Sequence, residues 1–185
     1  MIGPPAEEAE KRGRPRFTKV QLYNDPSGLL SFWYAADWHL EVESKPLPCV
    51  RLTPDLSDPD THMAIALSEL GAPLLPEERA AVLEGVQEGL KQLEECEVQS
   101  LSEITVEGSW GVEWRCSFRC GEGRYVRRGR LFFRGPYQYA VVYQGSSQEC
   151  FSYWRGMFGW TMLTITPGAF DARRWLEAQN ASGRS

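Results

Sequence analysis

The sequence predicts an α+β domain in which helices cover a twisted, mostly antiparallel sheet. Most apolar segments are short and bounded by turns that contain Gly, Pro, Asn or Asp, which is typical of strands. Only two segments have apolar residues at helical spacing. The elements follow the order strands, helix, four strands, helix, without the strand–helix alternation of dinucleotide-binding folds.

The predicted strands fall into two groups. Before the first helix, short strands are expected at 20–23, 30–34, 38–42, 50–52 and 63–67. We expect 30–34 and 38–42 to form a hairpin. After the first helix, four longer strands are expected at 96–106, 109–120, 124–134 and 137–143. Glycine-containing turns separate these four, so neighbours should pair antiparallel.

The first predicted helix covers residues 76–95. Pro76 suits its first turn, and an apolar stripe follows at helical spacing. Gly85 and Gly89 lie beside this stripe, and each costs up to about 1 kcal/mol relative to alanine in a helix. We therefore expect these glycines to permit a close approach to the sheet.

The second predicted helix begins at Ser146, because Ser146 and Glu149 have the spacing of a capping box. Gly159 is expected to end it, with a final extended segment at 160–166. The apolar residues expected on its buried side are Phe151, Trp154 and Phe158.

One domain at 19–168 is expected between two tails. Residues 1–18 are polar and charged and predict a disordered tail, and residues 169–185 predict a tail with at most a short helix. No apolar run reaches the ~20 residues that span a bilayer, and the first thirty residues show no export signal. We therefore expect a cytoplasmic protein.

The net charge of −5 argues against bulk nucleic-acid binding. The basic run from Arg12 to Arg16 contains Arg-Gly-Arg-Pro, which is similar to the core of an AT-hook. A single copy beside several glutamates favours a charged tail over a DNA-binding site.

Five cysteines occur without a CxxC pair, and free thiols are expected. Cys116 and Cys120 share one face of a predicted strand with large aromatic residues, which favours two small core residues. They lie about 13 Å apart along an extended strand, too far for one metal ion to bridge. No metal site or cofactor is predicted.

The predicted hairpin 115–134 carries seven arginines and one acidic residue in an otherwise acidic chain. Five of these arginines have the strand parity to lie on one face as a partner-binding surface: Arg115, Arg119, Arg128, Arg130 and Arg134. Guanidinium groups suit carboxylate or phosphate ligands. The alternative is a solvated face balanced by glutamates on neighbouring strands or on the helix 77–95.

The segment 28–38 reads Gly-Leu-Leu-Ser-Phe-Trp-Tyr-Ala-Ala-Asp-Trp. Together with Tyr23, Asp25 and the late helix with Phe151 and Phe158, it resembles the Mog1/PsbP-like fold family, although Ala35 stands where that family usually has proline. The resemblance covers residues 20–166. It implies an α/β/α sandwich around a twisted antiparallel sheet, and a role as a partner-binding or assembly module.

Two functions from different classes remain open at this stage. The first is a non-enzymatic adaptor that docks an acidic partner through the arginine-rich hairpin. The second is a carrier that holds a small apolar ligand in an aromatic-lined pocket of roughly 300 Å³ or more. An enzyme is not favoured, because the sequence contains no nucleophile or phosphate-binding motif. The oligomeric state is left open.

Overall fold

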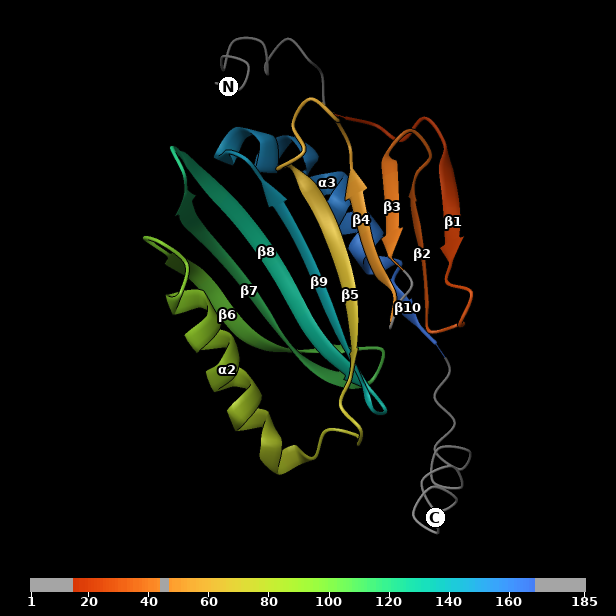
Figure 1. The fold of residues 1–185 in the computed structure, drawn as a ribbon, viewed down its shortest axis with the longest axis vertical. Coiled ribbons are helices and arrows are strands. Elements are labelled where there is room, and N and C mark those ends of the chain that lie inside the picture. The colour runs from red at the N-terminus through yellow and green to blue at the C-terminus, as the bar shows by residue number, and fades with distance from the viewer. Residues whose placement is uncertain (1–14, 44–46, 169–185) are drawn as a thin grey trace.

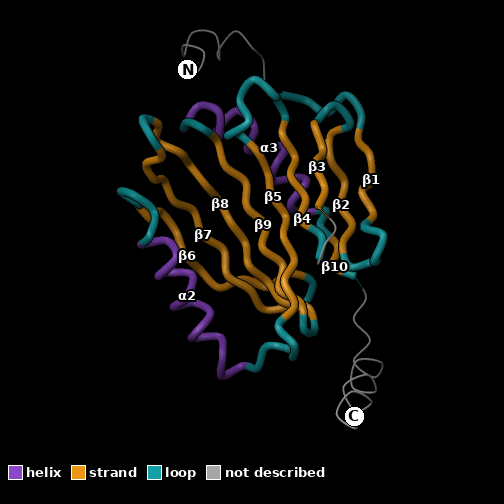
Figure 2. The backbone as a smooth tube through the Cα atoms, viewed as in Figure 1, coloured by secondary structure: helices purple, strands orange, loops and turns teal. Residues whose placement is uncertain are grey.

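The computed structural model describes residues 15–43 and 47–168. Within them, two antiparallel sheets and two α-helices form a layered α+β domain (Figure 1). Helix α3 (Gln148–Leu163) lies against one face of the larger sheet, and helix α2 (Arg79–Lys91) lies at the β6–β7 end of this sheet (Figure 2).

The larger sheet has seven strands in the order β3-β4-β5-β9-β8-β7-β6. Its strands are β3 (His39–Glu43), β4 (Cys49–Thr53), β5 (His62–Glu69), β6 (Glu97–Val106), β7 (Ser109–Cys120), β8 (Gly123–Arg134) and β9 (Tyr137–Gly145). The four consecutive antiparallel strands β6 to β9 confirm the prediction from the glycine-containing turns.

The smaller sheet consists of β1 (Val20–Asn24), β2 (Leu30–Ala35) and β10 (Thr166–Pro167). Strand β2 lies between β1 and β10, while β3 pairs with β4 in the larger sheet. The predicted hairpin of 30–34 with 38–42 is therefore wrong. A turn closed by the hydrogen bond from Trp38 N–H to the Ala35 carbonyl (3.1 Å) takes the chain from one sheet to the other.

Helix α3 differs from its prediction at both ends. Its N-cap is Ser147, whose Oγ accepts a hydrogen bond from Cys150 N–H (3.1 Å), not Ser146. The helix continues through Gly159 to Leu163, because Thr161 and Met162 are buried and their packing outweighs the low helix propensity of glycine.

Both ends of α3 are hydrogen-bonded to the rest of the domain. At the N-terminal end, Ser146 N–H donates to Thr61 Oγ1 (3.0 Å) and the Ser146 hydroxyl donates to Asp58 Oδ2 (2.8 Å). At the C-terminal end, Thr164 Oγ1 accepts from Trp33 N–H on β2 (2.9 Å). The helix is thus attached to the β4–β5 loop at one end and to the smaller sheet at the other.

The main core lies between α3 and the two sheets. Phe151 and Phe158 stack against Tyr143 of β9, with ring centroids 5.3 and 5.4 Å apart. Trp154 is half-buried and meets Trp38 edge-on at 6.1 Å. The predicted buried side of this helix is therefore confirmed for its two phenylalanines and holds in part for its tryptophan.

Helix α2 follows a short 3₁₀ turn, η1 (Pro76–Glu78), and covers the opposite face of the larger sheet. Leu90 packs there against Cys116 and Phe118 of β7 in a second, smaller core. The expected close approach at Gly85 and Gly89 is wrong: a Cβ at either position would meet nothing within 4 Å. Both glycines are exposed to solvent.

Phe17, assigned by the sequence to the N-terminal tail, packs against Trp160 of α3 with ring centroids 4.6 Å apart. The predicted tails otherwise lie mostly outside the described residues: Arg12 and Arg14 of the basic run fall there, as does the whole of 169–185. Among the described helices, none combines the length and the apolar character needed to cross a bilayer.

Candidate functional site: an arginine-lined cleft

An open cleft of about 610 Å³ lies between α3 and the part of the larger sheet formed by β6, β7 and β8. We call it the arginine cleft, after the charged residues among those that line it: Arg115, Glu113, Arg128, Arg130 and Arg155. Four guanidinium groups and one carboxylate give these side chains a net charge of +3 at neutral pH.

The pairing of β7 with β8 brings three of these arginines together. Arg115 lies directly opposite Arg128, and Glu113 lies opposite Arg130. Directly opposite residues in an antiparallel pair project from the same face. All four side chains therefore project from the face that α3 packs against, whereas Cys116 and Phe118 project from the other.

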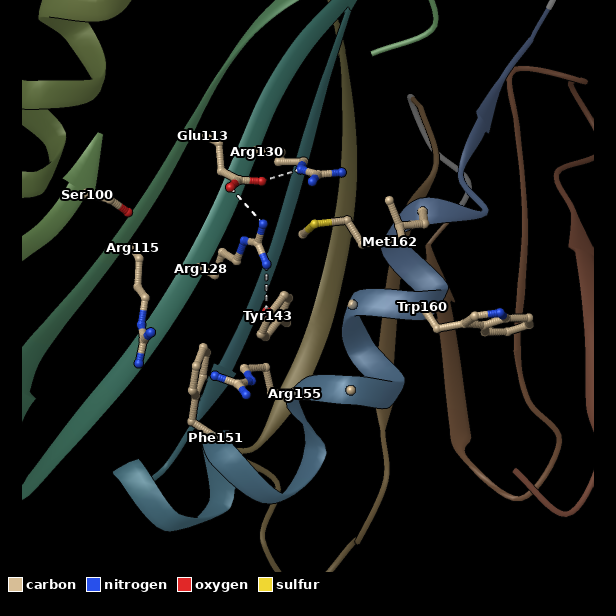
Figure 3. Close-up of a pocket in the computed structure, with 13 residues that line it drawn as sticks. Ser100, Glu113, Arg115, Arg128, Arg130, Tyr143, Phe151, Arg155, Trp160 and Met162 are labelled. Atoms are coloured by element: carbon tan, nitrogen blue, oxygen red, sulfur yellow. Dashed lines mark hydrogen bonds and ion pairs between the residues drawn. The ribbon is translucent and has the colours of Figure 1, made fainter. Parts of the chain in front are cut away.

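Glu113 holds two of the arginines in place. Arg128 Nη2 donates to Glu113 Oε1 (2.7 Å), and Arg130 Nε donates to Glu113 Oε2 (Figure 3). Burial alone would raise the pKa of the Glu113 carboxyl, but the hydrogen bonds and charges of the two arginines outweigh burial and lower this pKa. Glu113 is therefore ionised at neutral pH, and its single charge balances one of the two guanidinium groups.

Arg115 and Arg155 form no ion pair with a carboxylate in 15–43 or 47–168. Arg115 Nε is buried without a hydrogen-bond partner. The Arg115 guanidinium carbon lies 5.0 Å from the centroid of the Phe151 ring. In Figure 3 the guanidinium groups of Arg115 and Arg155 both point toward this ring, one from the sheet and one from α3.

At the level of sequence, neither a protein-family model nor a curated protein matches the chain. Solved structures do. The domain is similar to the solution structure of cyanobacterial PsbP from Synechocystis sp. PCC 6803, with a TM-score of 0.55 and 11% identity over 85% of this chain and 99% of that one.

It is also similar to LpqN of Mycobacterium tuberculosis, a protein involved in cell envelope biogenesis. The TM-score is 0.59 and the identity 15% over 89% of this chain and 97% of LpqN. PA94, a Pseudomonas aeruginosa protein of unknown function, matches at a TM-score of 0.53 and 12% identity, over 82% of this chain and 99% of that one. The chain has the Mog1/PsbP-like fold. The fold expected from the segment 28–38 is therefore confirmed, while identities this low carry no information about ligands.

Two of the five predicted arginines of this Mog1/PsbP-like domain lie outside the cleft. Arg119 is paired with Glu95 (3.0 Å) and lies 3.8 Å from Glu94. Arg134 lies at the far end of β8, opposite Tyr137, and is not among the residues that line the cleft. The interpretation as a solvated face balanced by glutamates thus describes the turn end of the hairpin. The interpretation as a single arginine-rich face describes its middle, which faces the cleft.

Arg155 was missed by the sequence analysis because it comes from α3 and not from the hairpin. A local signal was present. Arg155 follows Phe151 by four residues, a spacing that places two side chains on the same side of a helix. Once Phe151 is assigned to the buried side, Arg155 is expected at the margin of the same interface.

The cysteines show no arrangement that favours a metal site. Cys116 is buried, as predicted, but Cys120 is exposed, so its assignment to the core is wrong. Burial, together with the neighbouring Cys96, raises the pKa of the Cys116 thiol to about 12. Across 15–43 and 47–168, no three His, Cys, Asp or Glu side chains are grouped so that they could hold a metal ion.

A smaller apolar pocket of about 270 Å³ lies between α2 and β6. Leu90, Val98 and Leu101 contribute most of its apolar wall. Its volume falls below the roughly 300 Å³ expected of a small-molecule site. The larger cleft exceeds that value, but its walls carry charged groups that an apolar ligand would leave without partners.

Proposed function

We propose that this Mog1/PsbP-like domain is a non-enzymatic binding module that receives an acidic segment of a partner protein in the arginine cleft. The observation that carries the proposal is the pair Arg115 and Arg155. These two guanidinium groups share one cleft with two further arginines and have no carboxylate of their own within the described residues.

Electrostatics supports an anionic ligand. Guanidinium groups that share a cleft repel one another, more strongly where the side chains are partly buried, as at Arg128 and Arg130, than at Arg155, which is exposed. Arg130 and Glu113 have side chains only 18% and 19% exposed, so solvent screens this part of the cleft incompletely. A carboxylate placed between Arg115 and Arg155 would relieve this repulsion and form charge-assisted hydrogen bonds.

The shape of the cleft supports a polypeptide ligand. The cleft is open to solvent and extends from α3 across β7 to Ser100 on the edge strand β6. A segment of chain can lie along such an opening and present more than one carboxylate. The apolar-carrier alternative receives less support, because four arginines line the larger cavity.

The same geometry argues against general acid–base catalysis in the cleft. Its one carboxylate, Glu113, is held ionised by two arginines, and its lowered pKa makes it a weak base at neutral pH. Neither histidine is among the residues that line the cleft.

We also propose that the domain works in the cytoplasm, where the exposed thiols of Cys49 and Cys120 would remain reduced.

The test uses a fluorescein-labelled octapeptide of alternating glycine and glutamate, with the glycine–lysine counterpart as the charge control. Its affinity for the full chain is measured by fluorescence anisotropy. Arg155→Glu should weaken binding about tenfold or more, because it replaces an arginine of the cleft with a repelling carboxylate. Arg134→Glu is the matched control, since Arg134 lies on the hairpin but outside the cleft.

Charge reversal at Arg128 and Arg130 is less informative, since it would place two further carboxylates beside Glu113. Equal affinity of the Arg155→Glu and Arg134→Glu variants would contradict the proposal, and so would failure of the acidic peptide to bind at millimolar concentration. Full displacement of the peptide by millimolar inorganic phosphate would assign the cleft to a small anion instead.

A further inference from the structure

Strand β6 forms one edge of the larger sheet. Within the described residues, it pairs with β7 on one side and with no strand on the other. Its backbone takes part in no loop hydrogen bond there either. A ten-residue edge strand therefore offers a row of free N–H and C=O groups to another chain.

Few of the features that usually keep an edge strand from pairing with another chain are present along β6. The strand contains neither lysine nor proline, and its one register irregularity lies near its start, between Val98 and Ser100. From Ser100 to Val106 the pairing with β7 is regular. One of its acidic residues, Glu103, already accepts a hydrogen bond from Trp110 Nε1 (2.6 Å).

The face of β6 toward α3 continues the arginine cleft. Ser100 lies opposite Arg115, which lies opposite Arg128, so these three residues form one row across the sheet. The next row is Ser102, Glu113 and Arg130. Figure 3 shows Ser100 at the β6 margin of the cleft, on the same side as Arg115.

These rows define what an added strand would meet. Neighbouring strands lie about 4.8 Å apart, so an added strand would lie roughly 10 Å from β7. Because the Ser100 side chain is small, the long side chain of Arg115 can turn from the Phe151 ring and extend over Ser100 to a carboxylate on the added strand. A residue of the added strand beside Ser102 would have Glu113 as the nearest charged group in its row. A neutral residue therefore fits this position better than an acidic one.

The opposite face of β6 is apolar where it borders α2. Val98 is 50% exposed, and Leu101 lies beside it on the wall of the small apolar pocket. Alternate residues of a strand point to opposite faces. A segment added to β6 would therefore place its cleft-side residues near Arg115 and its other residues near Val98 and Leu101.

We propose that the partner segment binds as an extra strand on the free edge of β6. Its cleft-side residues alternate between acidic and neutral, and the residues on its other face are apolar. This inference rests on the proposed function for the identity of its ligand, and it adds the binding mode and the sequence pattern that the ligand must have. Backbone hydrogen bonds would supply affinity, and the alternating side chains would supply specificity.

The experiment uses the acetylated octapeptide Val-Glu-Val-Thr-Val-Glu-Val-Thr and two N-methylated forms of it. One form is methylated at every valine and the other at every glutamate and threonine. In a strand, alternate residues direct their N–H groups to the same side, so only one of the two forms loses its hydrogen bonds to β6. That form should bind the full chain about tenfold or more weakly than the other.

A second measurement locates the strand. On addition of the unmethylated peptide, the exposed-edge amides between Ser100 and Val106 should exchange with solvent more slowly, as read by NMR. Equal affinity of the two methylated forms, or unchanged exchange along β6, would overturn the added-strand mode. If the glycine–glutamate peptide still depended on Arg155, the proposed function would stand without this mode. If the affinity of the glycine–glutamate peptide did not depend on Arg155, the proposed function itself would be contradicted, whatever the binding mode.

Discussion

The face of the larger sheet toward α3 has two halves that differ in what covers them. On β5 and β9, Met63, Tyr143 and Val141 are fully buried beneath α3 and the smaller sheet. On β7 and β8, in the same cross-strand rows, the chain places Arg115, Arg128 and Arg130. On the strands that lie beside α3 and not beneath it, arginines replace the apolar side chains. The covered half thus holds the fold together, and the other half carries the charged side chains of the arginine cleft.

The largest effect is expected in the covered half. Phe158→Ala removes a fully buried ring that stacks on Tyr143 and should lower the free energy of unfolding by about 3–5 kcal/mol. Urea denaturation measures the change. The control is Leu163→Ala on the same helix, which is 74% exposed and should change stability by no more than about 0.5 kcal/mol. Similar losses in both variants would contradict the assignment of the core.

A smaller effect is expected at the boundary between the halves. Glu113→Gln removes the charge that holds Arg128 and Arg130 and should cost about 1–2 kcal/mol of unfolding free energy. Urea denaturation near neutral pH gives this value, and Glu122→Gln in the exposed β7–β8 turn is the control. A loss no greater than that of the control would show that the two arginines do not depend on Glu113.

The same carboxylate predicts a pH dependence. Because the pKa of Glu113 is lower in the folded protein, its stabilisation is present above the ordinary carboxyl value of 4.5 and is lost as the pH falls through the lower, folded value. The difference in stability between the wild type and Glu113→Gln should therefore shrink below about pH 4.5. Urea titrations at stepped pH measure it, and a constant difference would contradict the ion pairs.

The smallest effect is expected in the uncovered half. Arg115→Met keeps a long apolar side chain against Phe151 and removes a guanidinium whose Nε has no partner. The free energy of unfolding should change by no more than about 0.5 kcal/mol, since the lost ring contact and the relieved repulsion offset each other. Thermal and urea denaturation test this. A loss comparable to that of Phe158→Ala would show that Arg115 serves the fold and not a ligand.

The sequence predicted the four-stranded ribbon because its information is local: alternating residues, with glycines at the turns. The pairing of β2 with β10 in the smaller sheet could not be predicted, because it joins residues more than 130 positions apart in the chain. The end of α3 was misplaced for a related reason. Burial of Thr161 and Met162 against distant strands, not the local propensity of Gly159, decides where the helix stops.

The residues of the candidate site also divide into those that local sequence information places and those that distant contacts place. Strand parity correctly placed Arg115, Arg128 and Arg130 on one face of the hairpin. It could not separate them from Arg119, because the pairing of Arg119 with Glu94 and Glu95 depends on how the chain leaves α2. It could not supply Arg155 either, since the distance between a helix and a sheet is set by packing and not by spacing along one strand.

The attachment of α3 at both ends has a kinetic consequence. Hydrogen bonds from Ser146 to Thr61 and Asp58, and from Trp33 to Thr164, fix α3, which forms one wall of the arginine cleft. A receptor that is already in its bound shape loses little free energy to rearrangement. Capture of a negatively charged chain should then be limited by diffusion and long-range attraction, and its association rate constant should fall as ionic strength rises.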